Sequence, residues 1–153
     1  MTDAAEQQDQ TQTLNDSVIG GLLGYNLKRS YLVVRAAAQD ALAPYDLRVV
    51  SMTALSVIVD NPGIAPSQIA DALQMERSNI VVILDDLETR QLITRTRSKT
   101  DRRRFALTAT LRGRRMRDKA AEDTAAAEDT AAALTAAEKT ELLRLLGKLR
   151  TGA

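Results

Sequence analysis

Cationic side chains gather in one short stretch of this 153-residue chain. Ten lysines and arginines fall between positions 95 and 117, and only Asp101 opposes them there. The net charge is just +1 because acids near the two ends of the chain offset this stretch. Guanidinium groups bind phosphate oxygens through charge and paired hydrogen bonds, so the stretch predicts a surface for a polyanion. These residues are Arg95, Arg97, Lys99, Arg102, Arg103, Arg104, Arg112, Arg114, Arg115 and Arg117.

A second set of polar side chains falls on a predicted helix from Arg77 to about Gln91. Apolar residues at helical spacing give this helix an inner face formed by Ile80, Ile83, Leu84 and Leu87. At about 100° per residue, the opposite side carries Ser78, Val82 and Asp85, with Arg77 and Asn79 on its flanks. Alone, the pattern equally fits an ordinary amphipathic surface helix.

These side chains have functional groups that can read DNA bases. Ser78 and Asn79 can donate to and accept from base edges, Arg77 can reach a guanine or a phosphate, and Val82 can touch a thymine methyl.

The neighbouring elements would hold both sets on one scaffold. A short helix begins at Pro66, before the helix from Arg77, and strands are predicted over 92–97 and 103–109. Ile64 and Ala65 could add one rung to this hairpin. The order is a helix-turn-helix followed by a wing, which suits a major groove and the adjoining backbone or minor groove.

The rest of the chain predicts long helices. Gly20, Gly21 and Gly24 weaken the first of these locally, and Thr110 is the expected N-cap of the helix after the wing. The expected fold is mainly α: a winged helix-turn-helix with long N- and C-terminal dimerisation helices and a small β wing. An acidic, disordered tail (1–13) precedes an N-terminal helix (14–45), a DNA-binding lobe (46–112) and C-terminal helices (113–153). Thr135 and Glu138 form a capping box before a leucine-rich helix. Apolar faces on these terminal helices predict a homodimer.

A hexamer, Ala-Ala-Glu-Asp-Thr-Ala, occurs twice in succession, at 120–125 and 126–131. Six residues is not a helical period, so the two copies form no common stripe. A tolerated duplication within a good helix former is the simpler interpretation.

Composition narrows the classes of function. The chain has no cysteine and no histidine, which removes thiol chemistry, the commonest metal ligand and the commonest general base. Residues 1–15 lack the apolar core of a signal peptide, and no apolar run approaches the ~20 residues of a membrane span. We therefore expect a cytoplasmic protein that is not an enzyme, without a metal, cofactor or membrane partner.

The ordered set of motifs resembles the MarR family of bacterial transcription regulators. Asp101-Arg102-Arg103 looks like the family's wing tip, and 110–113 (Thr-Leu-Arg-Gly) resembles the start of its fifth helix. Supporting similarity lies in 42–47, 68–73 and 87–93. Gln91 departs from the usual glycine, Ala109 from leucine, and Ala65 from a serine or threonine cap.

The resemblance implies a homodimer that binds pseudo-palindromic double-stranded DNA and that a ligand releases. It also implies that Arg103 enters the minor groove while Asp101 fixes its angle, although Asp101 could be a plain turn residue. Arg102 and Arg104 are expected beside it. The arginines at 112–117 could contact phosphates or form a solvated face, and the sequence leaves both readings open.

The effector is expected to be a small aromatic carboxylate or an aromatic acyl-CoA, since cysteine and histidine sensing chemistries are missing. By resemblance, its pocket lies where the first, second and fifth helices meet, near Tyr25, Arg29, Tyr45 and Met52. Core packing is the preferred alternative for Met52. Lys28, Arg29 or Arg35 could bind the CoA phosphates.

Two alternatives remain at this stage. One is a winged-helix DNA-binding protein with no small-molecule effector, and the other is a helical adaptor or enzyme. The acids Asp85, Asp86 and Glu88 would be the enzyme's candidate cluster, but they are better interpreted as helix surface. The sequence does not reveal the operator, the regulated genes, or whether the protein represses or activates.

Overall fold

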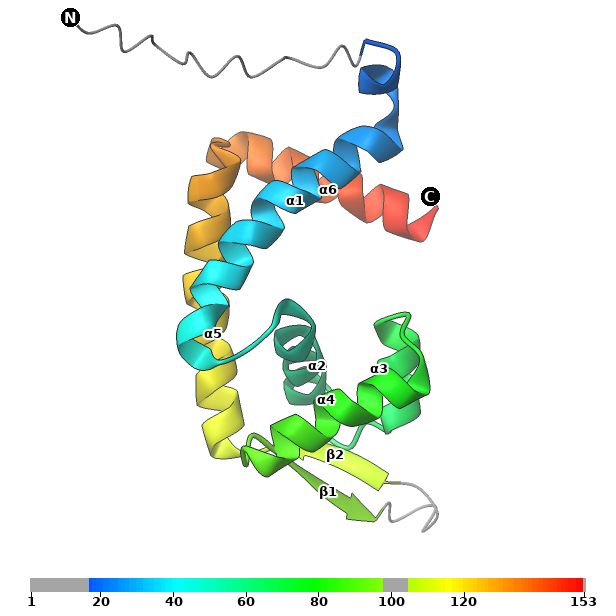
Figure 1. The fold of residues 1–153 in the computed structure, drawn as a ribbon, viewed down its shortest axis with the longest axis vertical. Coiled ribbons are helices and arrows are strands. Elements are labelled where there is room, and N and C mark those ends of the chain that lie inside the picture. Colours follow the sequence, from blue (N-terminus) through cyan, green and yellow to red (C-terminus); the bar gives the residue numbers. More distant parts are fainter. Residues whose placement is uncertain (1–16, 98–104, 153) are drawn as a thin grey trace, which may run out of the picture. The chain divides into compact units, whose positions relative to one another are not determined.

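The computed structural model describes residues 17–97 and 105–152 of the chain. They are mainly helical, with one two-stranded antiparallel sheet (Figure 1), which confirms the expected fold class. The chain divides into two compact units, 1–32 and 33–153. The predicted acidic tail lies outside the described residues.

The helices and strands follow the predicted order, with short 3-10 turns added around the first long helix. The elements are η1 (Ile19–Gly21), α1 (Leu23–Leu42), η2 (Ala43–Tyr45), α2 (Val49–Asp60), α3 (Pro66–Ala72), α4 (Arg77–Thr89), β1 (Ile93–Arg97), β2 (Phe105–Ala109), α5 (Leu111–Ala132) and α6 (Ala136–Thr151).

The predicted helix over 14–45, with its local weakness at the glycines, is broken near its start. A short 3-10 turn ends at Gly21, Leu22 is extended (φ −86°, ψ 125°), and the α-helix begins only at Leu23. Glycine lowers helix propensity, and Gly20, Gly21 and Gly24 concentrate that cost at this point. Prediction of a local weakness here was therefore right, but the result is a break.

The core of the second unit lies beneath the helix-turn-helix and the sheet. Ile80, Ile83, Leu84 and Leu87 of α4 are all buried, as the periodicity predicted. They join buried residues of α2, α3 and β2 in one cluster. Burial of these apolar side chains is the main stabilising contribution to the unit.

The wing is an antiparallel pair whose register runs from Ile93 opposite Ala109 to Arg97 opposite Phe105. The predicted extra rung is present as a bridge between Ile64 and Leu107. Leu107 and Ala109 are buried, whereas Phe105, which alternates with polar or small residues in the same strand, is 44% exposed. Its position at the open end of the sheet leaves it no core to enter.

The junction between β2 and α5 is fastened to the end of α4. The Thr110 hydroxyl accepts from the Gly113 backbone N–H at 2.9 Å, which confirms the predicted N-cap. The same hydroxyl donates to the Gln91 carbonyl at 2.8 Å. Gln91 has the left-handed backbone (φ 57°) that its place in a glycine position implied. A Cβ on Gly113 would lie 2.0 Å from the Leu92 oxygen, so only glycine fits there.

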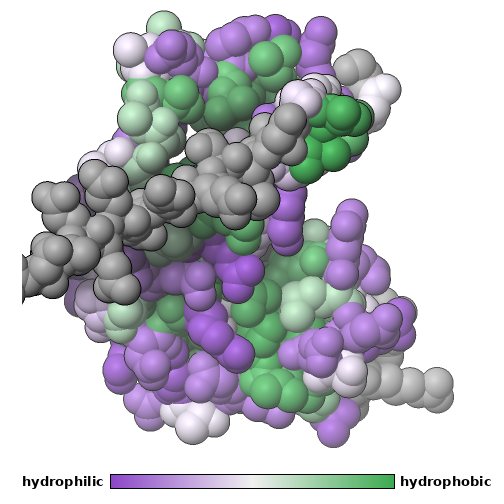
Figure 2. All heavy atoms as spheres, turned by 45° about the horizontal axis from the view of Figure 1, so that its top comes forward, coloured by the Kyte–Doolittle hydropathy of each residue, from purple (hydrophilic) through white to green (hydrophobic). Residues whose placement is uncertain are grey.

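The terminal helices expose apolar side chains, which contribute green patches to the surface in Figure 2. In the second unit these are Leu142, Leu143, Leu145 and Leu149 of α6. The predicted capping box of α6 is present: the Thr135 hydroxyl and backbone amide both hydrogen-bond Glu138, and these bonds lower the pKa of that carboxyl. In the first unit Val18, Leu22, Leu23 and Leu32 are exposed in the same way.

The two copies of the hexamer serve different contacts on α5. Asp123, in the first copy, accepts a hydrogen bond from the Tyr45 hydroxyl of η2. Asp129, at the matching position of the second copy, pairs with Lys139 of α6.

Within the described residues, no single helix has the length and apolar character needed to cross a bilayer. Among these residues, only the segments Leu23–Tyr45 and Val49–Asp60 taken together are long and apolar enough, and the chain bends by 73° between them.

Candidate nucleic-acid interface and adjoining pocket

The start of α4 carries a face of exposed polar side chains. Arg77, Ser78 and Asn79 are exposed, and their side chains make no hydrogen bond or ion pair within the described part of the chain. Val82 is 64% exposed one turn later. An apolar side chain that large on a rigid, exposed helix is suited to contact with another apolar group, such as a thymine methyl. The structure thus brings together the four predicted reading residues of this helix.

The turn before α4 fixes this face. Gln74 adopts a left-handed conformation (φ 51°), and the Met75 amide donates to the Ala70 carbonyl at 2.9 Å. The chain thereby closes α3 with an αL cap and starts α4 at Arg77. The buried face of α4 then leaves the reading residues no freedom to turn inward.

The wing supplies cations beside α4, although part of it is outside the described residues. Lys99, Asp101, Arg102, Arg103 and Arg104 all fall there, so their predicted roles at the tip stay predictions. Arg97, at the end of β1, lies over the Phe105 ring, with 5.6 Å between the guanidinium carbon and the ring centroid. That contact holds the cation at the base of the wing.

Arg95 has a different environment from the one predicted. Its Nε lies 2.9 Å from a Glu88 carboxylate oxygen and its guanidinium also pairs with Asp85, so it connects β1 to α4. Only 20% of its side chain is exposed. This placement favours a brace between the wing and the reading helix over the predicted DNA contact.

The arginines of α5 divide into two kinds. Arg114 donates to the Ala109 carbonyl at 2.7 Å, and Arg117 pairs with Asp60 of α2 at 3.2 Å. Both therefore support the fold. Arg112 and Arg115 are exposed and have no such partner in the parts of the chain that the structure describes, so only these two stay available for phosphates.

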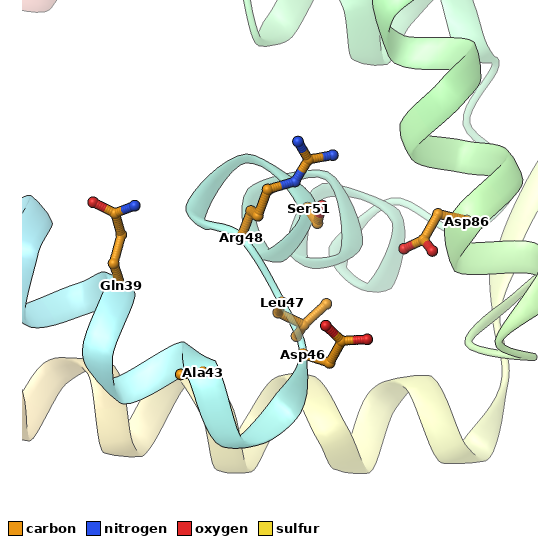
Figure 3. Close-up of a pocket in the computed structure, with 7 residues that line it drawn as sticks. All are labelled: Gln39, Ala43, Asp46, Leu47, Arg48, Ser51 and Asp86. Carbon is orange, nitrogen blue, oxygen red and sulfur yellow. The ribbon is translucent and has the colours of Figure 1, made fainter.

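A pocket of about 450 Å³ lies between the end of α1, the start of α2 and α4. In Figure 3 the carboxylates of Asp46 and Asp86 are directed toward the space between α4 and the turn before α2. Arg48 provides the cation, and Ser51 is a buried polar residue at 4% exposure. The lining residues are Gln39, Ala43, Asp46, Leu47, Arg48, Ser51 and Asp86.

The predicted effector residues do not themselves line this pocket. Tyr45 and Met52 directly adjoin the lining residues Asp46 and Ser51, but Met52 is buried within the core cluster. Tyr25 and Arg29 belong to the first unit, where the guanidinium lies 5.9 Å from the ring centroid. Among the described residues no cluster of His, Cys, Asp or Glu could hold a metal ion.

Sequence reasoning missed the lining residues because their polar groups are spaced irregularly along the chain. The one local signal was Asp46, which follows Pro44 and Tyr45 and has a left-handed backbone (φ 50°). Aspartate tolerates that conformation better than most residues, so the turn was recognisable, but the place of its side chain in the pocket wall was not.

A network of polar contacts holds the turn that carries Asp46. Arg90, at the end of α4, donates to the carbonyls of Tyr45 and Asp46, each at 2.7 Å, and lies 3.5 Å from the Asp86 carboxylate. The Tyr45 hydroxyl donates to Asp123 of α5. That hydrogen bond, together with burial and the charges of Asp123 and Glu122, raises the pKa of Tyr45 to about 12.

Comparison with known proteins places this arrangement in a family. The MarR family model matches residues 45–104, which include α2, α3, α4 and the first wing strand, β1. The chain is 30% identical over 128 residues to the HTH-type transcriptional repressor Rv2887 of Mycobacterium tuberculosis, covering 83% of this chain and 92% of that one. It is also 36% identical over 93 residues to a regulatory protein for the hcr operon of Thauera aromatica; the match spans 60% of this chain and 56% of that protein.

Solved structures agree. The transcriptional repressor CouR, bound to a 23-mer DNA duplex, superposes with a TM-score of 0.82 at 33% identity, covering 90% of this chain and 98% of that one. CouR from Rhodococcus jostii RHA1 has also been solved with p-coumaroyl-CoA; it gives a TM-score of 0.73 at 30% identity, over 85% and 92% of the two chains. The Rv2887 complex with p-aminosalicylic acid gives 0.70 at 29%, over 83% and 97%. Its motifs, its winged fold and these relatives together show that the chain belongs to the MarR family of DNA-binding transcription regulators.

Proposed function

We propose that this protein is a homodimeric repressor that binds a pseudo-palindromic operator and is released by a hydroxylated aromatic acid or its CoA thioester. The observation that carries the DNA-binding part is the free polar face at the start of α4, held rigidly beside a cationic wing. A two-fold dimer would set two such faces roughly 34–36 Å apart, one turn of DNA.

The dimer is supported by apolar surface that one chain leaves uncovered. Four of the five leucines of α6 are between 43% and 57% exposed, and exposed apolar side chains also lie along the first unit. Contiguous apolar surface of this kind marks an interface in most water-soluble proteins. A second copy of the chain is the partner that closed two-fold symmetry provides.

The effector class follows from the chemistry of the pocket between α1, α2 and α4. Its volume of about 450 Å³ suits one substituted aromatic ring with a short acyl chain. Arg48 can bind a carboxylate or thioester oxygen, while Asp46 and Asp86 can each accept a hydrogen bond from a ring hydroxyl. An aromatic acid without a hydroxyl would offer these carboxylates no hydrogen-bond donor, so the hydroxyl is expected to favour binding.

The relatives support this class. CouR was solved with p-coumaroyl-CoA, and Rv2887 with p-aminosalicylic acid and with salicylic acid. In a thioester, the CoA part would extend outside the pocket, and Arg35 of α1 is a candidate phosphate contact in the same unit. Lys28 and Arg29, in the first unit, remain candidates from the sequence alone. Tyr25 and Arg29 remain candidates for ring packing in the first unit.

A competition experiment tests the proposal. An operator is first selected from random duplexes, and release is measured with 4-hydroxycinnamate, 4-methoxycinnamate, cinnamate and the three CoA thioesters. The hydroxylated compounds should release the protein at the lowest concentration, and Arg48→Gln should raise that concentration. Arg150→Gln is the charge-matched control, because Arg150 is exposed at the end of α6.

Peroxide and zinc should not release the operator, since the chain has neither cysteine nor histidine. Equal potency of the hydroxylated and methylated compounds would remove the assigned role of the two carboxylates. Failure to select any duplex would contradict the DNA-binding function itself.

A further inference from the structure

Arg90 connects the wall of the pocket to the reading helix. It is the C-cap residue that directly follows α4, and its guanidinium reaches back to the turn between α1 and α2. Two of its N–H groups donate to the adjacent carbonyls of Tyr45 and Asp46, each at 2.7 Å. A planar guanidinium can satisfy two neighbouring acceptors at fixed angles, which a lysine cannot do.

The Nη1 group of Arg90 that donates to the Asp46 carbonyl also faces the Asp86 carboxylate. Asp86, one turn earlier on α4, lies 3.5 Å from Arg90 Nη1, and both Asp46 and Asp86 line the cavity. Arg90 therefore touches one lining residue through its backbone carbonyl and another through its carboxylate. A ligand hydroxyl that binds Asp86 competes with Arg90 for that carboxylate, and a ring that displaces the Asp46 turn moves the two carbonyls.

The turn is also anchored on the side away from α4. The Tyr45 hydroxyl donates to Asp123 of α5, and the Leu47 amide donates to the Leu42 carbonyl at 3.3 Å. A change at this turn is thus resisted by α5 and by the end of α1. The Arg90 side chain joins this anchored turn to the C-terminal end of α4, so α4 can change its tilt about that connection.

A small movement at this end matters at the other end of α4. The helix has 13 residues from Arg77 to Thr89, so it is roughly 20 Å long. A tilt of about 10° pivoting near Arg90 would shift Ser78 and Asn79 by roughly 3 Å over that length. Hydrogen bonds to base edges tolerate only a few tenths of an ångström, so such a shift would break them.

From this geometry we propose that Arg90 is the positioning residue through which occupation of the pocket changes the orientation of the reading helix. The inference rests on the proposed effector function and adds the route of coupling. Effector and operator act on one equilibrium, so each lowers the affinity for the other by the same factor. That factor is the quantity that Arg90 controls.

The test measures this factor as the ratio of operator dissociation constants with and without saturating 4-hydroxycinnamoyl-CoA. Arg90→Lys keeps the charge but cannot span both carbonyls, and Arg90→Gln removes the charge. Wild type is expected to show a ratio of about 5- to 150-fold, and both variants should fall to within about twofold of unity. Calorimetry on the DNA-free proteins should show that both variants still bind the compound, and Arg150→Gln should behave as wild type.

Melting temperatures of all variants are measured alongside, because a merely structural role for Arg90 would lower stability without changing the ratio. A wild-type ratio in both Arg90 variants, with the compound bound, overturns the inference and leaves the effector function standing. If wild-type protein neither binds the compound nor releases DNA, the effector function fails and the inference fails with it.

Discussion

A substitution at Arg95 distinguishes sharply between two roles for this residue, a DNA contact and a structural brace. Its guanidinium pairs with Asp85 and, at 2.9 Å, with Glu88, so replacement by glutamine removes two ion pairs between β1 and α4. The wing should then sample a wider range of angles relative to the reading helix. Operator affinity should fall because that freedom must be lost again on binding.

The size of the effect follows from the exposure of the pairs. The two acids are 59% and 42% exposed, and ion pairs of this kind contribute about 0.2–1 kcal/mol each. Loss of both costs at most about 2 kcal/mol, which corresponds to a decrease in affinity of roughly 30-fold or less. The slope of affinity against salt should stay unchanged, since no phosphate contact is lost.

A fluorescence-anisotropy titration of the selected operator over a series of salt concentrations measures both quantities. Asp85→Asn is the matched variant. If Arg95 is a brace, Asp85→Asn should weaken operator binding, and the loss in the Arg95→Gln/Asp85→Asn double variant should be smaller than the sum of the two single losses. A phosphate-contacting Arg95 requires the opposite, because loss of an acid beside DNA should tighten binding. A salt slope reduced by about one in Arg95→Gln, with tighter binding in Asp85→Asn, would refute the brace.

Four further perturbations test other parts of the molecule. Ser78→Ala and Asn79→Ala should each reduce the preference for operator over random DNA by roughly 1–3 kcal/mol, as competition assays would show; equal loss on both duplexes would assign them to backbone contact. Arg103→Ala should weaken binding on every sequence and reduce the salt slope by about one, and unchanged affinity would exclude its predicted wing role. Gly113→Ala should destabilise the fold by about 1–3 kcal/mol or more in denaturant titrations, because its Cβ would lie 2.0 Å from a backbone oxygen; an unchanged midpoint would mean that the junction can relax. Tyr45 has a pKa raised from 10.0 to about 12, so its protonated form stabilises the fold below pH 10 and that contribution is lost between pH 10 and 12; Tyr45→Phe should show a smaller decline in melting temperature over this range.

Periodicity and turn chemistry were sufficient to predict most of the fold. The buried stripe of α4, the extra rung at Ile64 and the cap at Thr110 each depend on neighbours within a few residues or on alternation along one strand. The break at Leu22 was only partly predictable, because three nearby glycines indicate weakness without saying where a helix will start. Patterns among neighbouring residues were therefore enough to predict the helices and strands and their order.

The sites were less predictable because their contacts join distant parts of the chain. Arg95 looked like one more cation of the wing, and nothing near it in sequence indicated that Asp85 and Glu88 would pair with it. The pocket combines Gln39 with Asp86, and Arg90 reaches carbonyls 44 and 45 positions away. Pairings of this kind are set by packing, which a single sequence does not display.

The number of hexamer copies in α5 determines the direction and position of everything that follows them, including α6. Each added or deleted copy would turn everything after it by about 240° around the helix axis and move it by about 9 Å along that axis. The present two copies bring Asp123 to Tyr45 on one side and Asp129 to Lys139 on another. Replication slippage at this tract is thus a single mutational step that redirects α6 and leaves α4 and the wing unchanged. Related regulators could in this way acquire a new subunit arrangement, and with it a new operator spacing. No substitution in the reading helix would be needed.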